Sequence, residues 1–268
     1  MNITLKQKII AKCAELDIPL VGFAPAKRWD KPLFEPWVPQ DFRPRSIFSE
    51  TQTVIVIGLP VNLPIVETSP SIYYHELYRT VNTLLDTNGY RISLFLNTEG
   101  FPSLWIPRDG YGSISFLKEK PITFFSHRHA AFLAGLGNFG INNMLLTEKF
   151  GPRVRFVSIF TAADIPADPV MERPLCTKCM QCVDICPVKA LDGRGYPEGL
   201  TDKKTCATRS EALYKRDISP CGLCIKVCPI GEDRKLYLRE DPRIYDEDDT
   251  AFALYHNAWK HVRSYGGR

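Results

Sequence analysis

The chain has 268 residues, of which 44% are hydrophobic and 24% charged, and its formal net charge is +4. This length predicts one large domain or two unequal ones. The mild positive charge permits an acidic partner but does not indicate a nucleic-acid partner. No basic and apolar leader opens the sequence, and its longest apolar run, TVIVIGLPV, is far shorter than a membrane span. We therefore expect a cytoplasmic protein that does not enter a membrane.

The first hundred residues alternate helical and extended patterns, which favours an α/β layer fold. The expected elements are a helix over 5–18, a strand over 20–25, a loop over 28–50, a strand over 53–60, a helix that ends near Gly89, and a strand over 91–97. Strand 53–60 is rich in β-branched residues, and Gly89 is expected to stop the helix before it.

The segment from residue 98 to 175 opens with a loop rich in glycine and proline. Ser126 is then expected to cap a short helix that ends at Gly135, and RVRFVSIF (153–160) alternates like a strand. The proline-rich stretch AADIPADPVMERPL (162–175) predicts a domain boundary. The expected domains are therefore an α/β domain at 1–165, a cysteine-rich domain at 166–235 and a helical tail at 236–268 that packs back.

Four of the nine cysteines stand in the run CTKCMQCVDICP (176–187). Thiols in the cytoplasm are kept reduced, so clustered cysteines there indicate metal binding. The spacing C-x2-C-x2-C-x3-C-P is that of bacterial ferredoxins, in which three thiolates bind one [4Fe–4S] cluster and the fourth binds another. One run therefore implies a partner run. The ninth cysteine, Cys13, lies in an apolar helix and is expected to be buried.

The partner run, CGLCIKVCP, supplies only three cysteines, because its first position falls at Ile218. Cys206 is the only unspent cysteine downstream of the first run, and a loop of 14 residues can return it to the site. The first predicted set is Cys176, Cys179, Cys182 and Cys228; the second is Cys186, Cys206, Cys221 and Cys224. Two [4Fe–4S] clusters in one small domain make an electron relay. The alternative, structural zinc, favours two Cys-x2-Cys pairs in tetrahedral sets.

The stretch GLGNFG (135–140) matches the glycine pattern of dinucleotide-binding folds. That pattern must follow a buried strand and open a helix. Here a helical segment precedes it, and the residues after it do not look helical. We therefore expect the glycines to bring the backbone close to some other large, flat ligand.

Several stretches together resemble the epoxyqueuosine reductase family and its relatives, the reductive dehalogenases. They are LDIPLVGFAPA, TVIVIGLP, YYHELYRTVNTLL and AGLGNFGINNMLLTEKFGPRVRF (134–156), together with the cysteine pattern and its detached Cys206. The resemblance implies a nitroreductase-like α/β domain that binds cobalamin with no histidine on cobalt, followed by a ferredoxin-like domain. The clusters would take electrons from a low-potential donor such as ferredoxin or flavodoxin and deliver them to cobalt, which reduces a small organic substrate.

The resemblance also assigns residues. The cobalamin contacts it implies, by position, are Gly135, Gly137, Gly140, Asn142, Asn143, Gly151 and Arg153. The acidic proton donor of epoxyqueuosine reductases is replaced here by Pro121, which argues for another substrate than epoxyqueuosine in tRNA. His127, His129 or Tyr111 is the alternative donor. The imidazole of either histidine titrates near neutral pH, and Tyr111 would donate from its phenol.

Two other functions stay open. The first is that of an electron-transfer module that docks on another redox enzyme. The second is that of a nucleic-acid-binding relative whose clusters are structural. A glycine segment packed tightly against protein favours the first, and salt-dependent binding to tRNA favours the second. Neither the oligomeric state nor the substrate follows from the sequence.

Overall fold

A four-stranded sheet forms the centre of the computed structural model, which describes residues 4–31, 38–108, 113–119 and 123–265. Its strands are β1 (Leu20–Pro25), β2 (Thr53–Pro60), β6 (Val154–Thr161) and β3 (Ser103–Ile106), in that spatial order. Every neighbouring pair is antiparallel. Strands over 20–25, 53–60 and 153–160 were expected. β3 was not, because SLWI lies in a stretch rich in glycine and proline.

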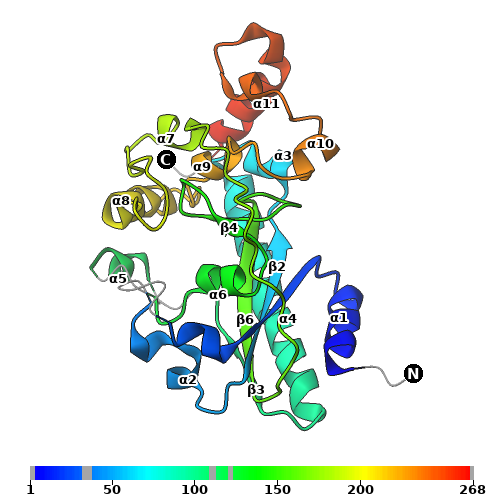
Figure 1. Ribbon diagram of the computed structural model, residues 1–268. Helices are drawn as coiled ribbons and strands as arrows, with labels where there is room; N and C mark the ends of the chain where they lie inside the picture. The colour runs from blue at the N-terminus through cyan, green and yellow to red at the C-terminus, as the bar shows by residue number, and fades with distance from the viewer. Residues whose placement is uncertain (1–3, 32–37, 109–112, 120–122, 266–268) are drawn as a thin grey trace.

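Both faces of the sheet are buried, so the fold has two cores. Successive side chains of a strand point to opposite faces. Ile55 and Ile57 of β2 therefore join one hydrophobic core, while Val54 and Val56 join the other. The first core contains residues of α1 (Leu5–Glu15) and α4 (Ile72–Thr98), and the second contains α6 (His127–Leu133). Figure 1 shows α4 running along the sheet.

The helix α4 continues to Thr98, so the expected strand at 91–97 is wrong. Ile92 and Leu96 are fully buried one helical turn apart and extend the apolar face of α4. Gly89 does not end the helix. A Cβ there would lie 3.3 Å from Trp105 Cβ and 3.3 Å from Val157 Cγ1, so the glycine allows α4 to approach β3 and β6 closely.

The glycine-rich stretch after α6 forms a small hairpin, β4 (Asn138–Phe139) paired with β5 (Leu145–Leu146). The glycine pattern thus follows a helix and leads into a strand, whereas a dinucleotide-binding turn follows a strand and leads into a helix. The pattern GLGNFG therefore forms part of a hairpin.

The cysteine-rich segment consists of short helices joined by irregular turns, and Figure 1 shows it at one end of the sheet. Its helices are α7 (Gln181–Asp184), α8 (Lys203–Tyr214), α9 (Leu223–Lys226) and α10 (Asp233–Leu236), and the tail that follows carries α11 (Ala253–Ser264). The remaining helices are α2 (Pro44–Ile47), α3 (Leu63–Val66) and α5 (Ile114–Glu119), with 3-10 turns η1 (Ala26–Trp29), η2 (Gln40–Phe42), η3 (Pro242–Tyr245) and η4 (Thr250–Phe252). Trp259 of α11 packs with Val227 and Tyr245 in a third core. Among the described helices, none combines the length and apolar character needed to cross a bilayer.

Candidate iron–sulfur site

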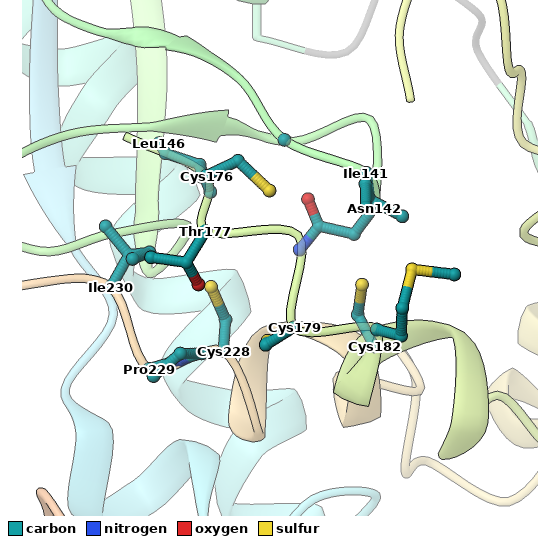
Figure 2. A pocket seen from close by; sticks show the side chains of 12 residues that line it. Ile141, Asn142, Leu146, Cys176, Thr177, Cys179, Cys182, Cys228, Pro229 and Ile230 are labelled. Carbon is teal, nitrogen blue, oxygen red and sulfur yellow. The ribbon is translucent and has the colours of Figure 1, made fainter. Parts of the chain in front are cut away.

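The first predicted cysteine set lines one pocket. Its four members lie on three segments: Cys176 and Cys179 precede α7, Cys182 lies in α7, and Cys228 follows α9. Figure 2 shows Cys176, Cys182 and Cys228 turned toward the same space, with Asn142 between them. The pocket is completed by Gly140, Ile141, Asn142, Leu146, Thr177, Met180, Pro229 and Ile230.

The loop that carries the first three cysteines is tightly wound. Lys178 has a φ of 55° and Met180 a φ of 64°, both in the left-handed region that side chains rarely adopt. Met180 then begins α7, whose first turn carries Cys182. Alternating left-handed residues reverse the chain within a few positions, which turns the thiols of Cys176 and Cys182 inward and leaves Cys179 exposed. Strain of this kind is typical of functional loops.

The second predicted set is also gathered in space. The pKa of Cys224 is raised first by burial and then by Cys206 and Cys221, with Cys182 and Cys186 contributing less. The pKa of Cys206 is raised by burial, then by Cys221 and Cys186. Such electrostatic effects require short distances. The detached Cys206, which helix α8 carries rather than a loop, therefore lies within electrostatic range of the other three.

The thiol environment suits binding to iron cations. Burial raises the pKa of Cys182 to about 12, and Cys228, Cys179 and Cys176 add to the effect. Such thiols stay protonated unless a cation compensates their charge, and iron supplies that compensation because metal ligation deprotonates a thiol outright. Within the described ranges, no three histidine, cysteine or acidic side chains converge tightly enough for a single metal ion.

Two hydrogen bonds reach the sulfurs of the second set. The backbone N–H of Ala190 donates to Cys186 Sγ at 3.3 Å, and Arg209 Nε donates to Cys221 Sγ at 3.3 Å. Asn142 connects the two sets, because it faces the first pocket while its Nδ2 donates to the carbonyl of Cys224 at 3.4 Å. Hydrogen bonds to cluster sulfurs are among the features that set reduction potentials.

Arg153 joins the sheet to the cysteine-rich segment. Its side chain has no exposed surface and makes a bidentate pair with Asp233, with Nε–Oδ2 2.7 Å and Nη2–Oδ1 2.6 Å. Its other N–H groups donate to the carbonyls of Ile225 at 3.2 Å, Cys228 at 3.0 Å and Ile230 at 2.6 Å. A side chain with all donors used and no exposed surface has nothing to offer a corrinoid, which corrects the role expected of Arg153.

A second buried arginine completes this joint. Arg234 donates from Nε and Nη2 to the carbonyl of Cys228, at 3.0 and 2.6 Å, and it also contacts the Tyr245 hydroxyl. Tyr245 in turn donates to Glu67 Oε1 at 2.8 Å. The turn that carries Cys224 and Cys228 is therefore held through its backbone by two guanidinium groups.

The four glycines expected at the corrinoid are packed against protein. A Cβ on Gly135 would lie 2.1 Å from the carbonyl oxygen of Pro169, and one on Gly137 would lie 1.8 Å from that of Leu146. A Cβ on Gly140 would lie 2.9 Å from the Leu146 side chain, and one on Gly151 would lie 1.9 Å from the carbonyl oxygen of Ile230. The close approach that needs glycine is therefore between protein segments, and the corrinoid contact expected of these glycines stays a prediction.

Asn143 has a joining role as well. Its Oδ1 accepts from the backbone N–H of Thr201 at 2.6 Å, and its Nδ2 donates to the carbonyl of Gly199 at 3.1 Å. With Asn142 and Arg153, it ties the region from β4 to β6 to the cysteine-rich segment. The stretch with the strongest resemblance to known reductases is thus largely an interface between the two parts of the chain.

The histidine candidates for proton donation are both engaged. His129 is buried, with Nδ1 2.6 Å from Ser126 Oγ and Nε2 2.6 Å from the Tyr196 hydroxyl. Burial, followed by Arg128 and Lys203, lowers the pKa of His129 to about 3, so it is neutral at pH 7. Its role as a proton donor stays a prediction.

His127 lies with Nδ1 3.0 Å from Ser158 Oγ and Nε2 3.1 Å from the carbonyl of Pro107. These contacts connect the start of α6 to β6 and the end of β3. Tyr111 and Pro121 lie outside the described residues.

Arg128 faces the second cysteine set from α6. Its Nη1 donates to the carbonyl of Asn143 at 2.7 Å, and its side chain keeps contact with solvent. Desolvation nevertheless lowers the pKa of Arg128, with Arg155 adding to it, while Tyr78, Cys206 and Cys224 act in the opposite direction. We call Arg128, Tyr78, Arg155, Lys203 and Cys206 the Arg128 site.

The Arg128 site was missed by reasoning from the sequence, which gave Arg128 no role beyond a helix start. Arg155 lies over the Tyr78 ring at 4.3 Å, and Lys203 has its pKa lowered to about 8 by burial and then by Arg128. One signal was present: Lys203, Cys206 and Arg209 are spaced by three, and residues so spaced share a helix face. Arg128 has no such signal, because only the fold brings α6 to α8.

The fold is similar to that of solved epoxyqueuosine reductases and reductive dehalogenases. A family model described as a 4Fe-4S binding domain matches residues 173–192. The chain has homologues among two groups of enzymes, the reductive dehalogenases and the epoxyqueuosine reductases, and its structural neighbours carry the same two names.

The chain is 26% identical over 203 residues to tetrachloroethene reductive dehalogenase from Desulfitobacterium hafniense, an alignment that covers 70% of this chain and 33% of the relative. It is 31% identical over 127 residues to epoxyqueuosine reductase from Pseudomonas aeruginosa, covering 44% of this chain and 34% of the relative. The chain thus spans about a third of the length of these curated relatives.

Among solved structures, epoxyqueuosine reductase from Streptococcus thermophilus aligns with a TM-score of 0.58 and 16% identity, over 98% of this chain and 76% of that one. A reductive dehalogenase structure described as suggesting a mechanism for B12-dependent dehalogenation aligns with a TM-score of 0.59 and 19% identity, over 94% of this chain and 36% of that one. At these identities the likeness establishes a shared mixed α/β fold.

Proposed function

We propose that this chain is a reductase in which two [4Fe–4S] clusters pass electrons to an acceptor at the Arg128 site. The observation that carries the proposal is the gathering of eight thiols into two adjacent sets, of which only the second lies beside Arg128. The match to a 4Fe-4S binding domain and the homology to two groups of reductases support it. Residues 1–165 then form a nitroreductase-like domain and residues 166–235 a ferredoxin-like domain with a tail.

Electrons enter at the first set in this proposal. Cys179 is exposed, as are its neighbours Lys178 and Met180. The second set also has an exposed member, Cys206, but that cysteine belongs to the Arg128 site, which this proposal assigns to the acceptor. A low-potential one-electron donor, such as a ferredoxin or flavodoxin, therefore approaches the first cluster most closely at Cys179. Asn142 lies between the two sets and fixes their separation.

The acceptor that the homology favours is a corrinoid, because one structural neighbour is described as B12-dependent. The predicted glycine cradle does not fit it, since protein fills the space beside each glycine. The residues left to contact a corrinoid are those of the Arg128 site, where Arg128 and Cys206 keep exposed surface. A bound corrinoid would supply a strongly reducing cobalt. The neutral His129 and Tyr196, hydrogen-bonded to each other, would exclude charge and water from one side.

The test is an anaerobic titration of the reconstituted chain with cobalamin, followed by its visible spectrum. The proposal predicts saturable binding with a change to a spectrum that lacks the lower axial base. The variant Arg128→Glu should weaken binding, whereas Arg243→Glu, an exposed change at the far 3-10 turn η3, should leave it unaltered. No binding at micromolar cobalamin would exclude the corrinoid and leave the cluster relay in place.

A second candidate function is electron transfer to a separate redox enzyme. The tight packing of the glycine segment favours it, because the segment needs no ligand to explain its composition. This candidate predicts two reducible clusters, no cobalamin binding, and rapid re-oxidation of the reduced clusters only when the partner enzyme is added.

A further inference from the structure

Helix α8 brings more than a ligand to the second cluster. Lys203, Cys206 and Arg209 lie on one side of the helix, three residues apart, so the two cations flank the thiol in the turn before it and the turn after it. Arg209 Nε donates to Cys221 Sγ at 3.3 Å. Lys203 begins the helix, where the helix dipole disfavours a cation, and the carboxylate of the adjacent cap residue Asp202 offsets this.

A third cation approaches from a different element. Arg128 of α6 acts on Cys206 and on Cys224, and its effect on Cys206 exceeds that of Asp202, the carboxylate that caps α8. Three positive charges from two helices thus surround the second cysteine set. In the proposed holoprotein this set holds a [4Fe–4S] cluster with four thiolates, which carries net negative charge and gains more on reduction.

The first cysteine set has a different environment. Among the described residues, those that line its pocket include no charged side chain. The charges of Arg153 and Arg234 act on Cys228 and lower its pKa against the larger effect of burial, but both guanidinium groups donate to its carbonyl and not to its sulfur. Asp233 and Glu67 belong to the same network as counter-charges. The sulfurs of the first set therefore lack the direct cationic contact that Arg209 gives Cys221.

We propose that Arg209, with Lys203 and Arg128, raises the reduction potential of the second cluster above that of the first and so fixes the direction of the relay. Positive charge and hydrogen bonds to sulfur both stabilise the reduced cluster. One electron leaves the first cluster, which is oxidised from the +1 to the +2 state, and reduces the second from +2 to +1. A low-potential donor supplies that electron to the first cluster. The inference rests on the proposed pair of clusters.

The replacement of a loop cysteine by a helix cysteine then has a physical consequence. Ile218 occupies the position where a ferredoxin run would place its first cysteine, and it is buried. Moving the ligand to Cys206 places the cluster against α8. This helix carries Lys203 one turn before Cys206 and Arg209 one turn after it. Arg209 acts here as a tuning residue through its hydrogen bond to the cluster ligand Cys221, and the charges of Lys203 and Arg128 add to its effect.

The test is an anaerobic redox titration of the full reconstituted chain, with each cluster followed by electron paramagnetic resonance. Arg209→Gln should lower the potential of the more positive cluster and leave the other unchanged. We expect about a tenfold loss in the equilibrium constant for transfer between the clusters, which is about 59 mV for a one-electron couple. Arg209→Lys should restore part of the potential. Arg243→Gln removes one equally positive charge at a distant, exposed site and should shift neither cluster.

Lys203→Gln provides a second variant if Arg209→Gln fails to fold, and it should shift the same cluster by less. Two clusters with unchanged potentials in both variants would overturn the inference while leaving the relay intact. A shift of the more negative cluster would reverse the direction of the relay and overturn it as well. A wild-type chain that binds a single cluster would instead refute the proposed function.

Discussion

The buried pair Arg153–Asp233 is the contact whose loss should disturb the molecule most. Asp233→Asn keeps the shape of the side chain and removes its charge. Arg153 would then keep its bonds to the carbonyls of Ile225, Cys228 and Ile230, but its positive charge would be buried without a counter-charge. The change therefore isolates the electrostatic part of the joint between the sheet and the cysteine-rich segment.

Breaking a buried ion pair from one side costs about 3–5 kcal/mol. The amide introduced by Asp233→Asn still offers an oxygen to one N–H of Arg153, so we expect the lower end, about 3 kcal/mol. For a chain of this size each kcal/mol lowers the melting temperature by about 2–4 °C, which predicts a drop of roughly 6–12 °C. This is a large part of the stability of a typical domain.

The assay is the thermal midpoint of the anaerobic holoprotein, measured by circular dichroism at one scan rate. Asp241→Asn is the matched control, because Asp241 pairs with Arg243 on the surface, with both side chains well exposed. Surface pairs contribute little, so this control should melt like the wild type. Equal midpoints for the two variants would show that the Arg153 joint does not stabilise the fold as described.

Two further predictions follow from single side chains. The pKa of His129 is lowered from 6.5 to about 3 in the folded chain. Between these values the imidazole binds a proton in the unfolded chain but not in the folded one, so the free energy of unfolding should fall as the pH is lowered from 6.5 toward 3. His129→Gln should flatten the fall of the melting temperature between pH 7 and 5, and an unchanged slope would assign it to other groups. Gly137→Ala places a methyl 1.8 Å from the Leu146 carbonyl oxygen and should destabilise the chain far more than Gly100→Ala, which has open space despite its φ of 87°. Equal melting temperatures for these two variants would contradict the tight packing of the hairpin.

Three of the four strands of the sheet were predictable because local pattern and burial agree there. LVGFAP and TVIVIGLP are short apolar runs, and each forms a strand buried within the sheet. RISLFLN has equally strong strand character, yet it forms the last two turns of α4. Its helical spacing becomes visible only once Gly89 is understood as a contact point with β3 and β6. A glycine that stops one helix serves close packing in another, and sequence alone does not separate the two cases.

The cysteines were the most informative part of the sequence, because ligand spacing limits geometry directly. The structure brings Cys176, Cys179 and Cys182 together with the distant Cys228, and it brings Cys206 to Cys221 and Cys224. The resemblance to corrinoid enzymes was less informative about individual residues. It marked the segment from Gly135 to Arg153 correctly as important, but the importance lies in backbone contacts between two parts of the chain. Those contacts depend on partners such as Pro169 and Ile230, which no local pattern identifies.

The central claim is that eight thiolates divide into two interlocked sets, with Cys206 in the second. Iron and acid-labile sulfide analysis of the anaerobically reconstituted protein tests it most directly. The account predicts about eight of each per chain in the wild type and about four after Cys206→Ser. Cys13→Ala, which removes the buried cysteine of α1, should leave both values unchanged. About four iron atoms in the wild type, or an unaltered content after Cys206→Ser, would contradict it.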